Sequence, residues 1–167
     1  MASWERVFTD LAETRGRALL RHAYLLTGDA AEAADLVQEA LLRAFGRTTR
    51  GLTLESAEAY VRRAILTIHI DGQRRSGRWT RIRHLVAVRD SSDGPEGAVV
   101  DGTDLRSALA TLSPRQRACV VLHYYEDLTV AQVADLLGLA PGAVKRYLSE
   151  ARGRLEPLLS DTREDLR

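Results

Sequence analysis

The stretch Thr129–Leu155, TVAQVADLLGLAPGAVKRYLSEARGRL, carries the spacing that two short crossing helices require. Thr129 opens an N-terminal capping box with the glutamine three residues later, so the two side chains satisfy backbone amides reciprocally. Ala134 is small enough for two helix axes to approach each other, and Gly138 four residues later supplies a turn. Val144 then packs the second helix back against the first. The pattern predicts a helix-turn-helix.

The second helix of this motif begins at Pro141 and has a basic outer face. The side chains that this face offers to a nucleic acid are Lys145, Arg146, Tyr147, Ser149, Arg152 and Arg154. Glu150 is the one acid interspersed with them. Such a face suits insertion between the phosphate ridges of a duplex. The alternative interpretation is an ordinary helical hairpin with a basic surface, which would need neither that glycine nor a charge-biased exposed side.

Helical periodicity extends over most of the 167 residues and predicts an all-α fold. The first periodic segment ends at Gly28, the second covers 29–45, and the third runs from about Ser56 to Arg75. A stretch rich in glycine, serine and proline then interrupts the pattern. We therefore expect two small helical domains, residues 1–76 and 103–160, joined by a flexible linker over 77–102 and followed by a disordered tail over 161–167.

The second domain begins with an apolar stripe that includes Leu105. Ser113 and Pro114 then start a new helix, because serine caps the free amides and proline fits the first turn. Within that helix, helical periodicity predicts that Tyr125 faces the core and Tyr124 faces solvent.

Charge is unevenly distributed although the net charge is only +1. Residues 43–89 carry eleven basic and three acidic side chains, whereas the flanking segments 1–42 and 90–112 are acidic. A segment of this charge attracts polyanions, and nucleic acid is the first candidate. A solvated helix face with a basic linker is the alternative. Trp79 lies in this segment, where it would either stack on a base or pack against a neighbouring domain.

The helix expected over 29–45 has a second stripe that a core alone does not explain. Asp35, Gln38, Glu39 and Leu42 recur at the spacing of one helix face, opposite the face expected to be buried. An acidic stripe that ends in an exposed leucine is typical of a docking surface, although simple solvation would produce the same pattern.

Several classes of chemistry are not expected. Cys119 is the only cysteine and cannot form an internal disulfide, and it is expected to be a small core residue rather than a redox sensor. The four histidines are scattered, so no metal site and no cofactor are predicted. No carboxylate pair suggests catalysis. No apolar run is long enough to cross a bilayer and no signal peptide is recognisable, which predicts a cytoplasmic protein without membrane insertion.

Three stretches resemble regions 2 and 4 of a bacterial extracytoplasmic-function sigma factor. They are Leu20–Phe45 (LRHAYLLTGDAAEAADLVQEALLRAF), Ala59–Asp71 (AYVRRAILTIHID) and Leu112–Leu155 (LSPRQRACVVLHYYEDLTVAQVADLLGLAPGAVKRYLSEARGRL). Their order and spacing match this two-domain family, and the overall sequence is similar to the actinobacterial group named for sigma E.

The resemblance implies a protein that gives the RNA polymerase core enzyme its promoter preference and helps to open the duplex, without enzymatic activity of its own. Asp35, Leu36, Gln38 and Glu39 stand where the family docks on the clamp helices of the largest polymerase subunits, and Leu42 extends that stripe. The surface around 122–128 would meet the flap of the second large subunit.

The resemblance also implies binding to double-stranded and locally melted promoter DNA. The helix from Tyr60 to Arg75 stands where the family opens the element near minus 10. Its expected DNA-binding residues are Arg62, Arg63, Arg74 and Arg75, which would contact phosphates, with Thr67 and Asp71 beside them. The family holds a base of this element outside the duplex, in a loop pocket. Extruding a base costs a few kcal/mol, which stacking and cationic contacts must offset. The helix-turn-helix would read the element near minus 35.

The chain departs from the family pattern in three places. Thr67 replaces a common asparagine and offers one hydroxyl instead of an amide. Ala140 replaces the serine that usually caps the recognition helix, a loss of roughly 1 kcal/mol unless another group substitutes. Arg146 and Tyr147 follow Lys145 where a serine and an arginine are common, so base preference does not transfer from relatives.

Two rival functions fit part of this pattern. A sigma-like decoy would bind polymerase or another partner without directing initiation, and an ordinary helix-turn-helix repressor would need a dimer interface or a ligand domain. Many relatives are held by an anti-sigma factor, and the long linker would permit the same here. We expect a monomer when the chain is free.

Overall fold

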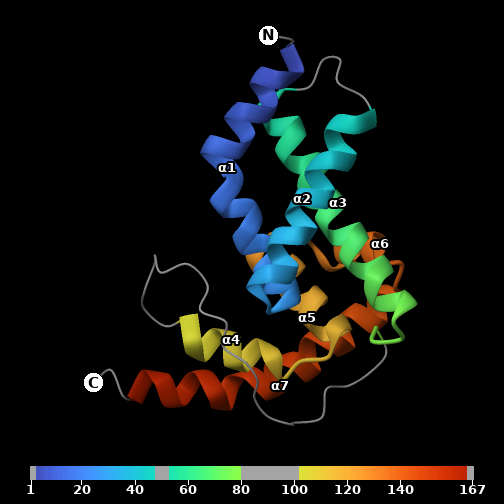
Figure 1. Ribbon diagram of the computed structural model, residues 1–167. Helices are drawn as coiled ribbons and strands as arrows, with labels where there is room; N and C mark the ends of the chain where they lie inside the picture. Colours follow the sequence, from blue (N-terminus) through green and yellow to red (C-terminus); the bar gives the residue numbers. More distant parts are fainter. Residues whose placement is uncertain (1–2, 48–52, 80–101, 165–167) are drawn as a thin grey trace. The chain divides into compact units, whose positions relative to one another are not determined.

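The computed structural model describes residues 3–47, 53–79 and 102–164, and within these ranges every regular element is a helix (Figure 1). The predicted all-α fold is thereby confirmed. The chain divides by its contacts into two units, 1–72 and 73–167. The division falls four residues before the predicted end of the first domain at residue 76, and most of the predicted linker lies outside the described residues.

The first unit is built from α1 (Ser3–Thr27), α2 (Ala30–Arg47) and most of α3 (Leu54–Arg75). The turn between α1 and α2 is short because Gly28 adopts a left-handed conformation with φ of 74°. Asp29 Oδ1 accepts a hydrogen bond from the Glu32 amide at 2.8 Å, which caps the start of α2. The Asp29 amide donates to Thr27 Oγ1 at 3.2 Å. α1 and α2 therefore pack side by side and run in opposite directions (Figure 1).

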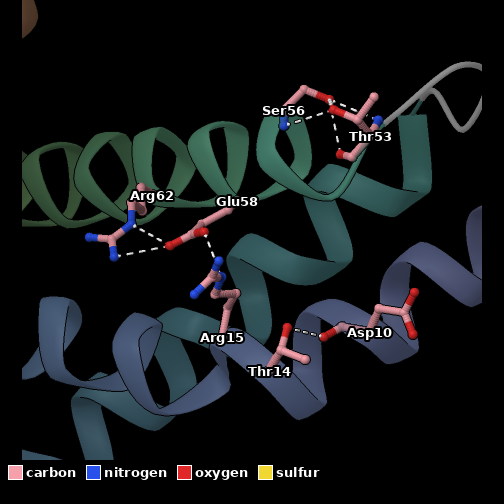
Figure 2. Close-up of polar contacts among 7 residues, drawn as sticks. All are labelled: Asp10, Thr14, Arg15, Thr53, Ser56, Glu58 and Arg62. Atoms are coloured by element: carbon pink, nitrogen blue, oxygen red, sulfur yellow. Dashed lines mark hydrogen bonds and ion pairs between the residues drawn. The ribbon is translucent and has the colours of Figure 1, made fainter.

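The core of the first unit consists of one apolar stripe from each helix. Its fully buried side chains include Leu11, Leu19, Ala23, Ala40, Val61 and Ile65. Phe8 and Phe45 meet edge to face, with ring centroids 5.1 Å apart. At the start of α3, the Ser56 amide and hydroxyl bond with Thr53, which closes the first turn (Figure 2). This burial leaves the opposite sides of α2 and α3 exposed.

The second unit contains α4 (Gly102–Ala110), α5 (Pro114–Val120), the π-helical η1 (Val121–Tyr125), α6 (Val130–Leu137) and α7 (Pro141–Glu164). α7 is the central element, because α4, α5 and α6 all pack against it. The buried side chains include Leu109, Leu112, Leu122, Val133, Leu137, Val144, Leu148 and Ala151.

α5 and α6 each begin with a capping box, the second of which the sequence predicted. Ser113 Oγ accepts from the Gln116 amide at 3.2 Å, while Gln116 Oε1 accepts from the Ser113 amide at 3.1 Å. Thr129 and Gln132 form the equivalent pair at 3.2 and 2.9 Å. α5 and α6 therefore begin where the sequence predicted.

The prediction that Tyr125 faces the core is wrong, because 41% of it is exposed. α5 changes into the π-helical η1, in which the Glu126 amide donates to the Val121 carbonyl at 3.0 Å. A π-helical turn holds more residues than an α-helical turn, so Tyr125 at the end of η1 is rotated away from the expected face, whereas Leu122 near its start stays buried. Asp127 follows with φ of 57°. His123 Nδ1 donates to the Leu128 carbonyl at 2.7 Å, since a carbonyl can only accept.

Two other expectations about the second unit are corrected. Leu105, predicted on the inner stripe, is 43% exposed. The predicted tail over 161–167 is helical as far as Glu164, where α7 ends. After Pro157 no glycine or proline interrupts the sequence, and extending an existing helix is far easier than starting one. None of the helices in the described ranges combines the length and apolar character that a membrane crossing needs.

Candidate functional site

The turn of the helix-turn-helix has the geometry that its sequence predicted. Gly138 follows α6 with φ of 64°, and the Leu139 amide donates to the Ala134 carbonyl at 2.9 Å, which satisfies the end of the helix. Ala134 and Val144 are buried between α6 and α7. The Val144 amide donates to the Ala140 carbonyl at 3.2 Å, so α7 begins regularly although Ala140 has no capping side chain. The exposed side of α7 is thereby fixed relative to α6.

Four of the six predicted contact residues on α7 lie on its exposed side. Lys145, Arg146, Ser149 and Arg152 are all exposed. Gly142 and Gly153, at the two ends of this surface, are exposed as well, and a methyl group added to either would meet no atom within 4 Å. We call the surface formed by these six residues the α7 face. It combines three cations with small residues that leave the backbone accessible.

Tyr147 and Arg154 are held on another side of α7. Arg154 Nη1 donates to the Thr111 carbonyl at the end of α4, at 3.0 Å. The Tyr147 hydroxyl accepts from Arg115 Nη1 of α5 at 3.1 Å, and this bond lowers the pKa of Tyr147 below its ordinary value. Both side chains are half-buried and connect α7 to its neighbours.

The α7 face borders an aromatic side chain that the sequence did not single out as a site residue. Arg152 Nη2 donates to the Tyr124 hydroxyl at 2.9 Å, and this bond raises the pKa of Arg152. Tyr124 is 55% exposed and meets the His123 ring edge to face at 4.8 Å. The prediction that Tyr124 faces solvent is confirmed. Its contact with Arg152 joins residues 28 positions apart and has no local sequence signal.

Within the second unit, residues 73–79 form a compact turn around Trp79. The Arg78 and Trp79 amides both donate to the Gln73 carbonyl, at 3.0 and 3.2 Å. Trp79 is only 4% exposed, and the guanidinium carbons of Arg74 and Arg115 lie 5.9 and 5.6 Å from its ring centroid. Trp79 is thus buried by packing within the second unit. Arg74 also donates to the Leu137 carbonyl at 3.1 Å.

The predicted minus 10 residues on α3 fall into two groups. Arg63, Thr67, Asp71, Arg74 and Arg75 are exposed and follow one another along the helix. The Thr67 hydroxyl donates to the Arg63 carbonyl at 2.9 Å. Arg62 lies on another side of α3, with 23% of its side chain exposed.

Arg62 belongs to an ion-pair network between α1 and α3 (Figure 2). Its Nε and Nη2 atoms both donate to Glu58 Oε1, at 3.2 and 3.1 Å. Glu58 Oε2 lies 3.2 Å from Arg15 Nε of α1. Glu58 precedes Arg62 by four residues, which is a sequence signal for such a pair. Arg62 thus has a structural role within the first unit.

The second stripe of α2 is exposed, whereas Leu36, which the resemblance placed with it in the docking set, is not. Asp35, Gln38, Glu39 and Leu42 are exposed, and Leu42 is the most exposed large apolar side chain described, at 68%. Glu39 Oε1 pairs with Arg43 Nη2 at 2.6 Å. Leu36 is 7% exposed and lies in the core. We call the four exposed residues the α2 stripe.

Cys119 and the acidic side chains offer no additional reactive site in the described parts of the chain. Burial raises the pKa of the Cys119 thiol to about 12, so at neutral pH it is a packed, protonated core residue as predicted. Among the residues that the structure covers, no three His, Cys, Asp or Glu side chains gather closely enough to hold a metal ion.

Comparisons with known proteins agree with this arrangement of two helical units. The sigma-70 region 2 family matches residues 11–79, and the sigma-70 region 4 family matches residues 103–155. The chain is 34% identical to the RNA polymerase sigma-E factor of Streptomyces avermitilis, over 96% of this chain and 89% of that protein. It is 38% identical to the ECF RNA polymerase sigma factor SigL of Mycobacterium tuberculosis, over 84% and 82% of the two chains.

A solved structure is similar as well. The sigma factor RpoE of Bartonella quintana, in complex with the anti-sigma factor NepR, matches 92% of this chain and 96% of its own, with a TM-score of 0.65 and 26% identity. The resemblance seen in the sequence is therefore confirmed. The chain belongs to the sigma-70 family, as an RNA polymerase sigma factor of the extracytoplasmic-function group.

Proposed function

We propose that the α7 face reads the minus 35 element of the promoters that this sigma factor serves. The observation that carries the proposal is the exposure of Lys145, Arg146 and Arg152 on one surface behind a tightly packed helix-turn-helix. Phosphate contacts from such cations supply affinity, and the small exposed residues beside them allow the helix to approach base edges. Residues 103–160 would form the domain with this role.

The salt dependence of DNA binding tests this proposal. The K145A/R146A variant of the full chain should bind a labelled duplex more weakly, and the slope of log K against log salt should fall by about 0.9 for each phosphate that the variant no longer neutralises. Fluorescence anisotropy at several salt concentrations measures the slope. R17A, which removes an exposed charge from α1, is the control. An unchanged slope in K145A/R146A would show that α7 does not contact phosphates.

We propose that the exposed side of α3 contacts the minus 10 element, with Arg63, Arg75 and, once it leaves Leu137, Arg74 on phosphates. Thr67 and Asp71 lie along the same side and would face the bases. Arg62 takes no part in this proposal, because Glu58 already holds its guanidinium.

We also propose that the α2 stripe docks on the RNA polymerase core enzyme. Its support is an exposed leucine that adjoins two carboxylates on a helix whose other side is fully packed. The D35K/E39K variant should keep its helical circular dichroism, because both side chains are exposed, but it should lose capture of the core enzyme in a pull-down. The D10K/E13K variant makes the same charge change on exposed positions of α1 and should keep binding. Equal capture of both variants would contradict docking through this stripe.

The family consists of initiation factors. This supports the proposal that the protein acts in the cytoplasm and has no catalytic activity of its own. The two units would each contribute a modest DNA contact, and attachment to one polymerase would join them through a high effective concentration. The Bartonella quintana relative is bound to an anti-sigma factor, which supports the expectation that an inhibitor of this kind also binds the present chain.

A further inference from the structure

A chain of polar contacts connects the start of α5 to the α7 face. The Ser113 amide donates to Gln116 Oε1 at 3.1 Å, and Gln116 Nε2 donates to Glu150 Oε2 at 2.9 Å. The other carboxylate oxygen, Glu150 Oε1, lies 3.8 Å from Arg146 Nε. These contacts connect the capping box of one helix to an exposed arginine of another.

Gln116 is the most restrained residue in this series of contacts. It is 3% exposed, and both ends of its amide are used: the oxygen closes the capping box and the nitrogen binds Glu150. A buried amide with partners at both ends has one favourable orientation, since a flip would place two donors or two acceptors against each other. Glu150 is therefore held from the inside of the unit.

The ion pair between Glu150 and Arg146 is weak as a source of stability. The two side chains are 46% and 63% exposed, and exposed pairs contribute little to the free energy of folding. At 3.8 Å the pair is an electrostatic attraction without a hydrogen bond, and it draws the Arg146 guanidinium toward a carboxylate that Gln116 holds in place. A second restraint acts on the same side, where the guanidinium carbon lies 5.1 Å from the Tyr147 ring centroid and Arg115 holds the Tyr147 hydroxyl.

We propose that Gln116 and Glu150 are positioning residues that set the angle at which Arg146 meets DNA, and thereby its base preference. The inference rests on the proposed role of the α7 face. Base discrimination by arginine depends on a bidentate geometry, whereas phosphate attraction depends mainly on charge. Loss of the restraint should therefore reduce discrimination at one base pair without reducing general affinity for DNA.

Selection from a duplex library with about ten randomised base pairs tests the proposal with the full chain. In Q116E, glutamate still suits the capping box, but its carboxylate repels Glu150. E150Q removes the charge that restrains Arg146. E156Q removes the same charge elsewhere on exposed α7 and is the control. Q116E and E150Q should each flatten the preference at one shared position by about three-fold, at the lower end of coupling between contacting residues.

The variants also separate positioning from a general effect on charge. E150Q and E156Q should bind a duplex without the selected site equally well or better than the parent chain, since each loses a negative charge. R146A should lose the preference at the same position, and R146A/E150Q should lose no more than R146A. If Q116E and E150Q select the same bases as the parent chain, the positioning role is wrong, but base recognition by α7 is not contradicted. A parent chain that selects no motif would overturn both.

Discussion

Replacement of Gly138 by alanine should destabilise the second unit by about 1 kcal/mol, because an L-residue in the left-handed conformation costs roughly 1–2 kcal/mol. The φ of 64° at this position creates that cost. A methyl group there would lie 3.7 Å from Arg74 Nη2, an ordinary contact, so no clash adds to it. Alanine has less conformational freedom than glycine in the unfolded chain, and this offsets roughly 0.4–1 kcal/mol of the loss of stability.

Gly153 provides a control with the opposite expected sign. It lies inside α7, is exposed and has no atom within 4 Å of an added methyl group. Alanine is favoured over glycine in a helix interior by about 1 kcal/mol, so G153A should stabilise the unit by that amount. The free energies of unfolding of G138A and G153A should then differ by about 2 kcal/mol.

Urea denaturation followed by tryptophan fluorescence measures both changes. The chain has two tryptophans, and Trp79 is buried in the second unit, so a W4F background leaves one reporter of that unit. The parent and both variants carry W4F, which cancels its own effect. A G138A protein as stable as its parent would refute the assignment of strain to this turn.

The remaining predictions concern charged or titrating side chains. Burial raises the pKa of Cys119 from 9.0 to about 12, so the unfolded chain loses the thiol proton first and stability should fall as pH rises above 9. At pH 10 the parent should lose about 1 kcal/mol more stability than C119A, and equal pH profiles from urea titrations would contradict this. R154M should lower the free energy of unfolding by about 1 kcal/mol, because the bond from Arg154 to the Thr111 carbonyl is lost. The salt slope of DNA binding should not change, and a changed slope would show that Arg154 contacts DNA. R62A should lower the thermal midpoint of the first unit, since Glu58 loses a half-buried partner. R63A should change the stability of that unit by under about 0.5 kcal/mol, and a larger loss of thermal midpoint in R63A than in R62A, measured by circular dichroism, would contradict the assigned roles.

Features that depend on neighbouring residues could be predicted from the sequence. A capping box joins residues three apart, so Ser113, Thr129 and their glutamines predict the starts of α5 and α6 without knowledge of the fold. The turn at Gly138 and the exposed stripe of α2 follow equally from short spacings. The Glu58 and Arg62 pair has the same kind of local signal, yet the strongly basic segment around it favoured a phosphate contact.

Features that depend on distant partners could not be predicted. Arg154 binds a carbonyl 43 residues away, and Tyr147 binds an arginine 32 residues away, so periodicity could place these side chains on a helix but not identify their partners. Leu36 fits the periodicity of the core and is buried, whereas the resemblance placed it on the docking surface. Tyr125 was misplaced because helical periodicity assumes an unbroken α-helix.

The π-helical η1 has a consequence for how this segment tolerates insertions and deletions. A π-helical turn is equivalent to an α-helix that has acquired one extra residue. Deleting one residue between Val121 and Tyr125 would remove that extra residue, so α5 could continue as a regular α-helix and the residues after the deletion would keep nearly their present direction. A deletion in the α-helical part of α5 has no such extra residue to remove, so it would rotate everything after it by about 100° about the helix axis and redirect the loop that leads into α6.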